Sequence, residues 1–455
     1  MIDTNLPDFE SELIEVINLF GGDELKIRHR FTESENKFVN TVTVNGKVYA
    51  YGNLVRNLSG EIEKKRLMKR YAKLSLYKGI SAFLNKTVPW GALTGIRPTK
   101  LAYQQIEKEG DFTEFFTDVM KVSPEKTALI KSVIDTQKGI YERKDENTDF
   151  FVFIPFCPSR CKYCSFISAD IKSAQKHIDA YVDTLVDEIH HAKQFIKKLR
   201  SIYIGGGTPV SLSDERLEKI LCAIDEINTG VEYTVEAGRP DVITESNLKM
   251  LKNHGVTRIC INPQTFLDKT LELLGRKHTA KDVEDKYNLA KDMFSVNMDL
   301  IAGLDGETFE DFKFSLDKAV SLNPDNITVH TLCIKRGSYL AQSEKRLSGE
   351  IVDEMVDYAR QTLTSNGYSP YYLYRQKYMA GNLENVGYAK SGKACVYNID
   401  VMEEIAQNVA CGANAISKRV YFGGERIERE ASPKDVATYI NKIEEIKRKK
   451  EKLFL

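Results

Sequence analysis

Three cysteines stand close together in the segment CPSRCKYC. They are Cys157, Cys161 and Cys164, and the other five of the eight cysteines are scattered singly along the chain. Thiolates are the natural ligands of iron–sulfur clusters. Three of them on one short loop can hold three corners of a [4Fe-4S] cubane and leave the fourth iron without a protein ligand. The spacing therefore predicts a redox cluster with one open corner.

A structural zinc ion is the main alternative for these three cysteines. Zinc prefers four ligands in a closed tetrahedron, commonly supplied as two paired half-sites. The chain has no second C-x-x-C pair, and the nearest following histidine, His177, lies in a segment expected to be helical. Disulfides are not expected, because the remaining cysteines form no framework. We expect most of these remaining cysteines to be small core residues: Cys222, Cys260, Cys333, Cys395 and Cys411.

The cysteine segment directly follows the first of six short apolar runs that alternate with helix-like stretches. Between the first two runs, Ile178, Tyr181, Val182, Leu185 and Ile189 mark one face of a helix. Repeated strand–helix alternation implies a parallel sheet with crossover helices, here an incomplete (β/α)6 barrel of the TIM type, in which chemistry gathers where strands end. The six runs are 150–156, 201–207, 232–238, 258–266, 296–304 and 326–334.

The sequence outside this pattern suggests two further parts, so that we expect an α/β protein of three domains. Residues 1–145 read as an N-terminal α+β domain of unclear role, in which Asn45-Gly46 favours a type I′ hairpin turn. The partial barrel then occupies 146–335, and a C-terminal α/β extension, 336–455, covers the substrate side. The charged segment IEEIKRKKEKL near the C-terminus is expected to be a solvated helix.

Composition narrows the classes of function. Lys plus Arg and Asp plus Glu number 65 each, so the formal net charge is zero and a chain-wide basic surface for nucleic acid is not expected. The acidic N-terminus does not resemble a signal peptide, and no apolar stretch is long enough to span a bilayer. We therefore expect a cytoplasmic protein that neither spans a membrane nor binds nucleic acid.

Polar residues also stand at the ends of other predicted strands. The turn Gly205-Gly206-Gly207-Thr208-Pro209 closes the second strand, and glycines allow backbone to approach a ligand closely. A tight strand-to-helix turn is the alternative for this segment. Glu236, Gln264 and Asp299 interrupt apolar strands, which is costly inside a barrel unless they are hydrogen-bonded to a ligand or to neighbouring backbone.

The ordered motifs IPFCPSRCKYCSF, GGGTP, GVTRICINPQTF, LLGRKHT and MDLIAGLDGET resemble the radical S-adenosylmethionine (SAM) superfamily. The resemblance is specifically to its oxygen-independent coproporphyrinogen III oxidase-like branch, which includes haem chaperones and HemZ-type proteins. WGALTGIRPTK and GYAKSGKACVYNIDVME are similar to HemZ-type proteins in particular. The resemblance implies a [4Fe-4S] cluster and SAM, whose amine and carboxylate bind the open iron.

The resemblance also implies roles for individual residues. Tyr163 would pack on the adenine of SAM, and Gln264 and Asp299 would hold the ribose hydroxyls. Arg276 would pair with the SAM carboxylate, for which a planar guanidinium is suited, and Glu236 would support the amino-acid end. Gly206, Gly207 and Thr208 would bind the SAM amine through their backbone. His278, two residues after Arg276, is expected to be structural.

A tetrapyrrole substrate carries several propionates, so its site should gather basic residues. The candidates are Lys335, Arg336 and Arg375, with Lys377, Arg97 and Lys100 as further choices; for each one, solvated surface charge is the alternative. The leading hypothesis is oxidative decarboxylation of coproporphyrinogen III to protoporphyrinogen IX. An electron donor such as flavodoxin or ferredoxin would be needed, and we expect a monomer.

Two departures from the pattern leave other functions open. Coproporphyrinogen oxidases carry a further cysteine two places after the third, where this chain has Ser165 and Phe166. The haem-binding pattern of the chaperones, His-Asn-x-x-Tyr-Trp, is replaced by the run Tyr397 to Met402. A haem-binding chaperone and a radical SAM enzyme acting on another tetrapyrrole are the alternatives.

Overall fold

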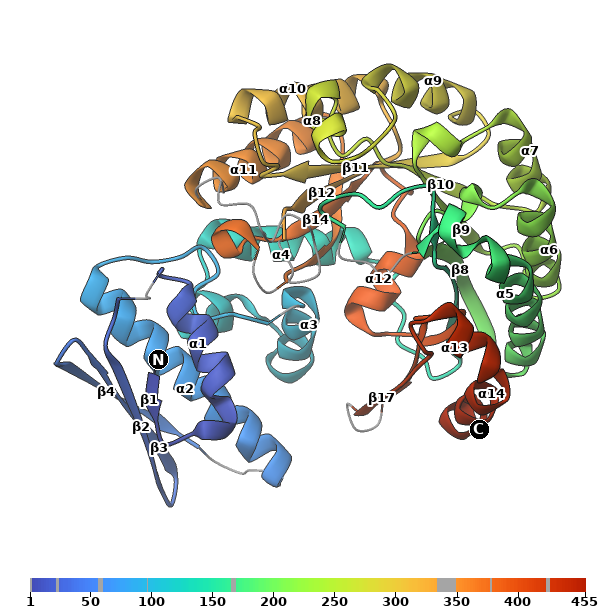
Figure 1. Ribbon diagram of the computed structural model, residues 1–455. Coiled ribbons are helices and arrows are strands. Elements are labelled where there is room, and N and C mark those ends of the chain that lie inside the picture. The colour runs from blue at the N-terminus through green and yellow to red at the C-terminus, as the bar shows by residue number, and fades with distance from the viewer. Residues whose placement is uncertain are drawn as a thin grey trace. The chain divides into compact units, whose positions relative to one another are not determined.

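The computed structural model describes residues 2–21, 24–55, 60–95, 97–164, 169–333, 349–376, 379–422 and 426–455. The chain divides into two compact units, residues 1–131 and 132–455 (Figure 1). The first unit ends within a helix, before the polar run that suggested a boundary at 145, and the three-part division 1–145, 146–335 and 336–455 stays a prediction.

The first unit contains a four-stranded sheet in the order β1-β2-β3-β4. Strand β1 runs parallel to β2, and the other neighbours are antiparallel. The predicted hairpin is confirmed, because β3 and β4 meet at Asn45 and Gly46, whose φ angles of 47° and 88° suit a type I′ turn. The strands are β1 (Ile2–Thr4), β2 (Ile27–Ser34), β3 (Lys37–Val44) and β4 (Lys47–Leu54).

Helices pack on this sheet and fill the rest of the unit. Helix α2 contacts β3 and β4, and Phe38, Tyr77, Trp90 and Phe116 are fully buried. The last helix, α4, continues into the second unit. The helical elements are η1 (Pro7–Phe9), α1 (Glu10–Asn18), α2 (Glu61–Leu84), α3 (Pro98–Glu109), η2 (Phe115–Val119) and α4 (Pro124–Gln137).

The second unit is built on an eleven-stranded sheet that contains the predicted barrel. Strands β5, β8, β9, β10, β11 and β12 are parallel neighbours in this order, which confirms the incomplete (β/α)6 barrel. Two short strands, β6 (Phe156–Cys157) and β7 (Ala169–Asp170), flank the cysteine loop. The barrel strands are β5 (Asn147–Ile154), β8 (Lys198–Gly206), β9 (Glu232–Gly238), β10 (Arg258–Ile261), β11 (Ser295–Ala302) and β12 (Asn326–Thr331).

Helices cover the outer side of this sheet (Figure 1). The predicted face of α5 is buried against it, and Thr244, Thr279 and Thr308 begin α7, α9 and α10 with capping boxes that satisfy free backbone N–H groups. The helices are α5 (Ile171–Ala192), α6 (Asp214–Asp225), α7 (Glu245–Asn253), α8 (Asp268–Leu273), α9 (Ala280–Ala290), α10 (Phe309–Leu322) and α11 (Gly349–Ser365). Short helical turns in the described part of the chain follow α5, precede α6 and α7, and lie between β13 (Ser369–Tyr374) and β14 (Asn385–Ala389): η3 (Lys193–Phe195), η4 (Pro209–Ser211), η5 (Pro240–Val242) and η7 (Ala380–Asn382).

The C-terminal segment adds strands to both edges of the same sheet. At one edge β14 pairs antiparallel with β12, and at the other β15 pairs parallel with β5. The helices α12 (Val396–Glu403), α13 (Val436–Asn441) and α14 (Ile443–Phe454) complete the unit. The added strands are β13 (Ser369–Tyr374), β14 (Asn385–Ala389), β15 (Gln407–Cys411), β16 (Ile416–Tyr421) and β17 (Arg426–Ala431).

The prediction of a solvated C-terminal helix is wrong in part. Helix α14 buries Ile446, Leu453 and Phe454, and Lys450 is only 2% exposed because it pairs with the buried Glu188 of α5. Glu444, Arg448, Lys449 and Lys452 of α14 are exposed, so the sequence predicts this outer face correctly. Among the described residues, no helix combines the length and apolar character needed to cross a membrane.

Candidate functional site

The three clustered cysteines lie at one end of a cavity inside the barrel. Strand β5 leads directly into the loop, whose turn is closed by a hydrogen bond from the backbone N–H of Cys164 to the carbonyl of Cys161 (3.1 Å). The N–H of Lys162 donates to the carbonyl of Leu274 (3.0 Å), which ties the loop to the segment after β10. All three cysteines line the cavity, which has a volume of about 400 Å³.

Hydrogen-bond donors surround the cysteine sulfurs. The hydroxyl of Thr208 lies 3.6 Å from Cys157 Sγ. Two guanidinium groups lie beside Cys161, with the Nη1 atoms of Arg276 and Arg239 3.9 and 4.0 Å from its sulfur. Positive charge and N–H groups at a sulfur stabilise its thiolate form, which is the form that binds metals. Two of the three sulfurs, those of Cys157 and Cys161, therefore lie beside groups that suit metal-binding thiolates.

Arg276 also joins the loop to the barrel strands. Its Nη1 donates to the hydroxyl of Tyr163 (2.8 Å), and its Nη2 donates to the carbonyl oxygens of Asn262 (2.6 Å) and Gly238 (3.4 Å). Burial, despite the charge of Arg276, raises the pKa of Tyr163. Tyr163 and Arg276, predicted at opposite ends of SAM, therefore lie in direct contact at the cavity wall.

Arg239 was not predicted as a site residue. It is 4% exposed and forms a two-pronged ion pair with Asp241, at 2.9 and 2.7 Å. Its third nitrogen donates to Ser159 Oγ (2.7 Å), inside the cysteine loop. The sequence signal for Arg239 was its position. Its segment GRPD follows the third predicted strand, just as the cysteine segment follows the first.

The glycine turn passes close under the cysteine strand. A Cβ on Gly207 would lie 2.4 Å from the carbonyl oxygen of Phe156, and Gly206 has a φ of 106°. Both positions therefore require glycine for steric reasons. Gly206, Gly207 and Thr208 nevertheless all line the cavity, so the tight turn also brings backbone to the site.

Glu236 is buried in the cavity wall and accepts a hydrogen bond from the Tyr203 hydroxyl (2.6 Å). Burial raises the pKa of Glu236 to about 7, and the negative charge of Asp299 adds to this effect, although the Tyr203 hydrogen bond opposes it. This carboxyl therefore changes charge near neutral pH, which the sequence alone did not indicate.

Gln264, which follows the end of β10, lies beside Asp299 in the middle of β11. The N–H of Gln264 donates to the carbonyl of Asp299 (2.9 Å), and Gln264 has a positive φ of 68°. Asn297 Nδ2 donates to Asp299 Oδ1 (2.8 Å), and His330 Nε2 lies 3.6 Å from Oδ2. Burial raises the pKa of Asp299, but the contacts with His330 and Asn297 outweigh burial and lower it.

Several buried polar atoms of the cavity wall have no hydrogen-bond partner among the described residues. They are Arg258 Nε, Arg276 Nε, Thr234 Oγ1 and Asn262 Oδ1. Leaving a buried polar atom unpaired costs about 1–3 kcal/mol, so such atoms indicate a place for a ligand or for water. The cavity is therefore built to hold a polar guest.

Aromatic and thiol side chains complete the cavity wall, and the sequence analysis missed most of them. Strand β13 of the C-terminal segment contributes Tyr372 and Tyr374, whose rings stack 6.3 Å apart. Alternation along a strand is a signal that could have placed both on one face. Cys260, Cys333 and Cys395 also line the cavity.

The prediction of core positions for the scattered cysteines is confirmed for Cys260, Cys395 and Cys411, which are buried. It is wrong for Cys222, which is exposed at the end of α6, and for Cys333, which is half-buried in the cavity wall.

Of the candidate substrate cations, Arg375 is a described residue of the second unit. Arg375 is buried and donates to the carbonyl of Asn382 (2.8 Å), whereas its sequence neighbours Tyr374 and Gln376 line the cavity. Burial lowers the pKa of Arg375 to about 10. Lys335, Arg336 and Lys377 lie outside the described residues, as do Ser165 and Phe166. Arg97 and Lys100 belong to the first unit, at the start of α3.

His278 is fully buried outside the cavity lining. Its Nδ1 lies 3.9 Å from Asp241 Oδ1, and burial together with Arg276 lowers its pKa to about 3. A neutral imidazole behind the Arg239–Asp241 pair fits the structural role predicted for it.

Comparisons with known proteins agree with this geometry. Residues 151–319 match the family model of the radical SAM superfamily. The oxygen-independent coproporphyrinogen-III oxidase-like protein HemZ of Bacillus subtilis is 36% identical over 433 residues, covering 89% of this chain and 85% of HemZ. The heme chaperone HemW of Haemophilus influenzae is 30% identical over 297 residues, covering 62% of this chain and 74% of HemW.

The solved structure of coproporphyrinogen III oxidase (HemN) from Escherichia coli shares the fold. The TM-score is 0.54 at 22% sequence identity, covering 71% of this chain and 73% of HemN. The extent of the match to HemZ, together with the cysteine loop at the end of the first barrel strand, shows that this chain belongs to the radical SAM superfamily, in its oxygen-independent coproporphyrinogen III oxidase-like branch.

Proposed function

We propose that the protein is a radical SAM enzyme that oxidatively decarboxylates two propionates of coproporphyrinogen III, giving protoporphyrinogen IX. The observation that carries the proposal is the position of the three cysteines, which open onto a polar cavity inside the barrel. Similarity to HemZ over most of both chains supports the substrate class.

The residues present fit a cluster and SAM. Cys157, Cys161 and Cys164 would hold three irons, and the unpaired Asn262 Oδ1 offers an acceptor for a ligand donor. When bound, a [4Fe-4S] cluster with SAM supplies one-electron cleavage of the S–C5′ bond and thereby a radical that abstracts hydrogen from an unreactive carbon.

The protein's own residues would bind and orient SAM. Arg276, which already contacts Tyr163, would move one of its N–H groups from a backbone carbonyl to the SAM carboxylate. Ionised Glu236 would attract the SAM amine, and Gln264 with Asp299 would accept from the ribose hydroxyls. The rigid placement of Gln264 on Asp299 at 2.9 Å prepares this pair before SAM arrives.

For each propionate, the balanced change is loss of one hydrogen atom, one molecule of carbon dioxide and one electron. The hydrogen atom goes to the 5′-deoxyadenosyl group, the carboxyl carbon leaves as carbon dioxide, and the electron goes to an acceptor. A reduced flavodoxin or ferredoxin would supply the electron that cleaves SAM. The cavity is also lined by Tyr372, Tyr374 and His330. These residues come from β13 and β12, which lie at the other end of the barrel strands from β8 and its glycine turn.

An anaerobic assay tests this function. Cluster-loaded protein, SAM and a reductant should convert coproporphyrinogen III to protoporphyrinogen IX, with one 5′-deoxyadenosine formed per carbon dioxide released. Mass spectrometry of the tetrapyrrole and quantification of 5′-deoxyadenosine measure both products. SAM cleavage with unchanged substrate would contradict the proposal, and a changed mass without loss of carbon dioxide would identify another tetrapyrrole reaction.

A haem chaperone is the second candidate, because several heme chaperone HemW proteins are similar to this chain over part of its length. The residue in place of the chaperone's histidine, Tyr397, is half-buried and stacks on Tyr203 with a centroid distance of 4.4 Å. Haem binding would therefore need another ligand, for which His330 is the cavity histidine. Titration with haem tests this idea: a saturable Soret shift that His330→Ala removes would support it, and no shift would exclude it.

A further inference from the structure

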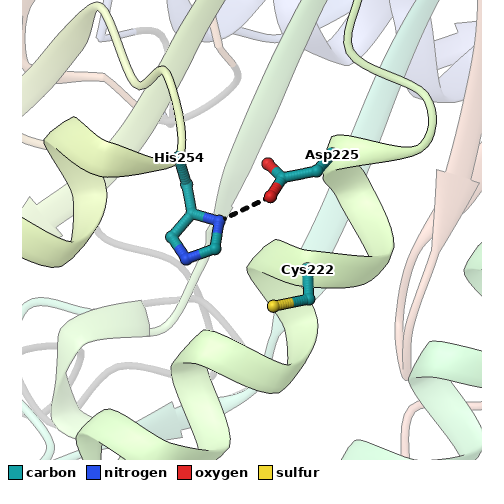
Figure 2. A group of neighbouring side chains, drawn as sticks. All are labelled: Cys222, Asp225 and His254. Atoms are coloured by element: carbon teal, nitrogen blue, oxygen red, sulfur yellow. Dashed lines mark hydrogen bonds and ion pairs between the residues drawn. The ribbon is translucent and has the colours of Figure 1, made fainter.

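A second group of potential metal ligands lies far from the cysteine loop along the fold. Cys222 and Asp225 are one turn apart at the C-terminal end of α6, and His254 caps the C-terminal end of α7. Figure 2 shows the carboxylate and the imidazole facing each other, with Cys222 on the same helix as Asp225. One ligand atom of each residue lies within 4.8 Å of the other two.

The chemistry of these three donors suits a divalent transition metal. Thiolate, imidazole and carboxylate are the three ligand types that zinc uses in proteins, at about 2.0–2.3 Å from the metal. Such bonds place ligand atoms about 3.5 Å apart, so a shift of about 1 Å would close the site. Cys222 is exposed and can rotate to make this shift. The donor set contains no lysine or arginine that would repel a cation.

The imidazole is already directed at the site. His254 Nδ1 lies 2.7 Å from Asp225 Oδ2, and the His254 side chain is only 13% exposed. Its backbone N–H donates to the carbonyl of Met250 (3.1 Å), and Gly255 follows with a φ of 76°. The helix end therefore holds this ring in place before any ion arrives, which reduces the entropic cost of binding.

A buried hydroxyl beside Asp225 gives independent support. Tyr233, on β9, is fully buried, and its hydroxyl has no hydrogen-bond partner among the described residues. The charge of Asp225 acts on this hydroxyl, so the two groups lie near each other. Carboxylates that bind metals are commonly held by such outer hydrogen bonds. A turned Asp225 could use one oxygen for the ion and accept from Tyr233 with the other.

We propose that Cys222, Asp225 and His254 form a zinc site that links the ends of α6 and α7, with water as the fourth ligand. Helix α6 ends shortly before the start of β9, and α7 ends shortly before the start of β10. The cysteine loop instead follows the C-terminal end of β5. The zinc site therefore lies at the barrel end opposite the cluster. In barrels of this type that end serves stability, so the ion acts as a structural link and not as a catalyst.

Zinc retention by the full-length, cluster-loaded protein tests the site. The protein is incubated with zinc chloride, desalted and analysed for zinc and iron by mass spectrometry. About one zinc per chain should remain, and competition with a chelating dye should show at least tenfold weaker binding for Cys222→Ser, Asp225→Asn and His254→Gln. Tyr233→Phe should weaken binding less than these three changes. Zinc should also raise the melting temperature of the unaltered protein but not of the Cys222→Ser variant.

The control is a second exposed histidine–carboxylate pair, which has no thiol in its group. His190 lies 3.5 Å from Glu226, and His190→Gln should leave zinc retention unchanged. Repeating the measurement in a Cys157→Ala/Cys161→Ala/Cys164→Ala variant removes binding at the cluster loop. The proposal is overturned if the unaltered protein retains no zinc, or if Cys222→Ser and His254→Gln retain as much as it does.

Discussion

Two buried polar regions of the second unit differ in how completely their polar atoms find hydrogen-bond or ion-pair partners within the protein. In the first, Glu188 of α5 meets Lys450 of α14 at 2.6 Å, with both side chains almost fully buried. Glu188 also accepts from the Tyr439 hydroxyl (2.5 Å) and from the N–H of Gly412 (2.7 Å). Each charged atom of this group has a partner within the protein.

The second region is the cavity beside the cysteine loop. There, Arg258 Nε, Thr234 Oγ1 and Asn262 Oδ1 are buried without a partner among the described residues. Ionisable groups such as Glu236 face the open space. A buried polar group that is fully satisfied stabilises one fold, whereas one left incomplete indicates that something else binds there. The comparison therefore separates a structural network from a binding site.

The largest effect should come from the cysteines. Cys157→Ala, Cys161→Ala or Cys164→Ala should each abolish cluster binding and SAM cleavage, because the remaining two sulfurs cannot hold the cubane. Iron content, the visible absorption of the cluster and 5′-deoxyadenosine formation measure this loss after anaerobic reconstitution.

Cys395→Ala is the matched control for the cysteines. Cys395 also lines the cavity, but its thiol donates to Glu232 (3.2 Å) at the start of β9, whereas the loop follows the C-terminal end of β5. This variant should keep its iron. Loss of the cluster in Cys395→Ala would show that Cys395 is also needed to hold the cluster, contrary to the proposal.

Breaking the satisfied network should instead affect stability. Lys450→Met leaves the Glu188 carboxylate buried without its ion pair, which should lower the free energy of unfolding by about 3–5 kcal/mol. Denaturant unfolding monitored by circular dichroism measures this change. The cluster absorption and SAM binding of the folded fraction should be unaltered.

A neighbouring lysine on the same helix provides the control. Lys449 pairs with Glu445, and their side chains are 50% and 43% exposed, so Lys449→Met should cost less than about 1 kcal/mol. Adding Glu188→Gln to Lys450→Met should restore part of the lost stability. Equal costs for the two lysines would contradict the distinction between the regions.

The sequence was sufficient to predict the parts of the site that depend on local spacing. Cys157, Cys161 and Cys164 share one loop, and the alternation of apolar runs placed that loop at a strand end. The hairpin at Asn45 and Gly46 was equally local. These features depend on residues that are neighbours in sequence, so a single chain reveals them.

Features that need distant segments to meet were missed. Lys450 lies in a charge run that looks solvated, and only Glu188, 262 residues away, makes it a buried residue. Tyr372 and Tyr374 line the cavity because β14 carries their strand to the edge of the barrel. Arg375, proposed as a substrate contact, follows the end of β13 and does not line the cavity. The sequence of β13 alone does not show which of its faces packs against the barrel strands.

Arg276→Lys should weaken the binding of SAM in the cavity, which is a smaller effect than the loss of the cluster. The variant keeps the charge but loses the planar group that contacts Tyr163 and Asn262 together. We expect SAM to bind about 10–100-fold more weakly, with iron content retained. Equilibrium dialysis of SAM measures the affinity. Arg375→Lys is the control, since that arginine does not line the cavity, and a similar loss there would contradict the placement of SAM.

The smallest effect is a pH dependence from Glu236. Its pKa is raised from about 4.5 to about 7, so below pH 7 the native carboxyl is neutral and above it is ionised. The native state then binds the proton more tightly than the unfolded state, and stability from this group falls as pH rises from about 4.5 to 7. Attraction for the SAM amine should change in the opposite direction, so that SAM affinity rises between pH 6 and 8, by up to about tenfold.

Glu236→Gln should remove both pH dependences and leave SAM binding weak throughout. Tyr203→Phe provides the finer control, because loss of the 2.6 Å hydrogen bond should raise the pKa of Glu236 further and move the rise in SAM affinity to higher pH. The ionised carboxylate is costly when the cavity is empty and favourable when a cation fills it. A SAM affinity that ignores pH, or that falls as pH rises, would mean that the amine does not bind at Glu236 and that this carboxyl belongs with the satisfied network.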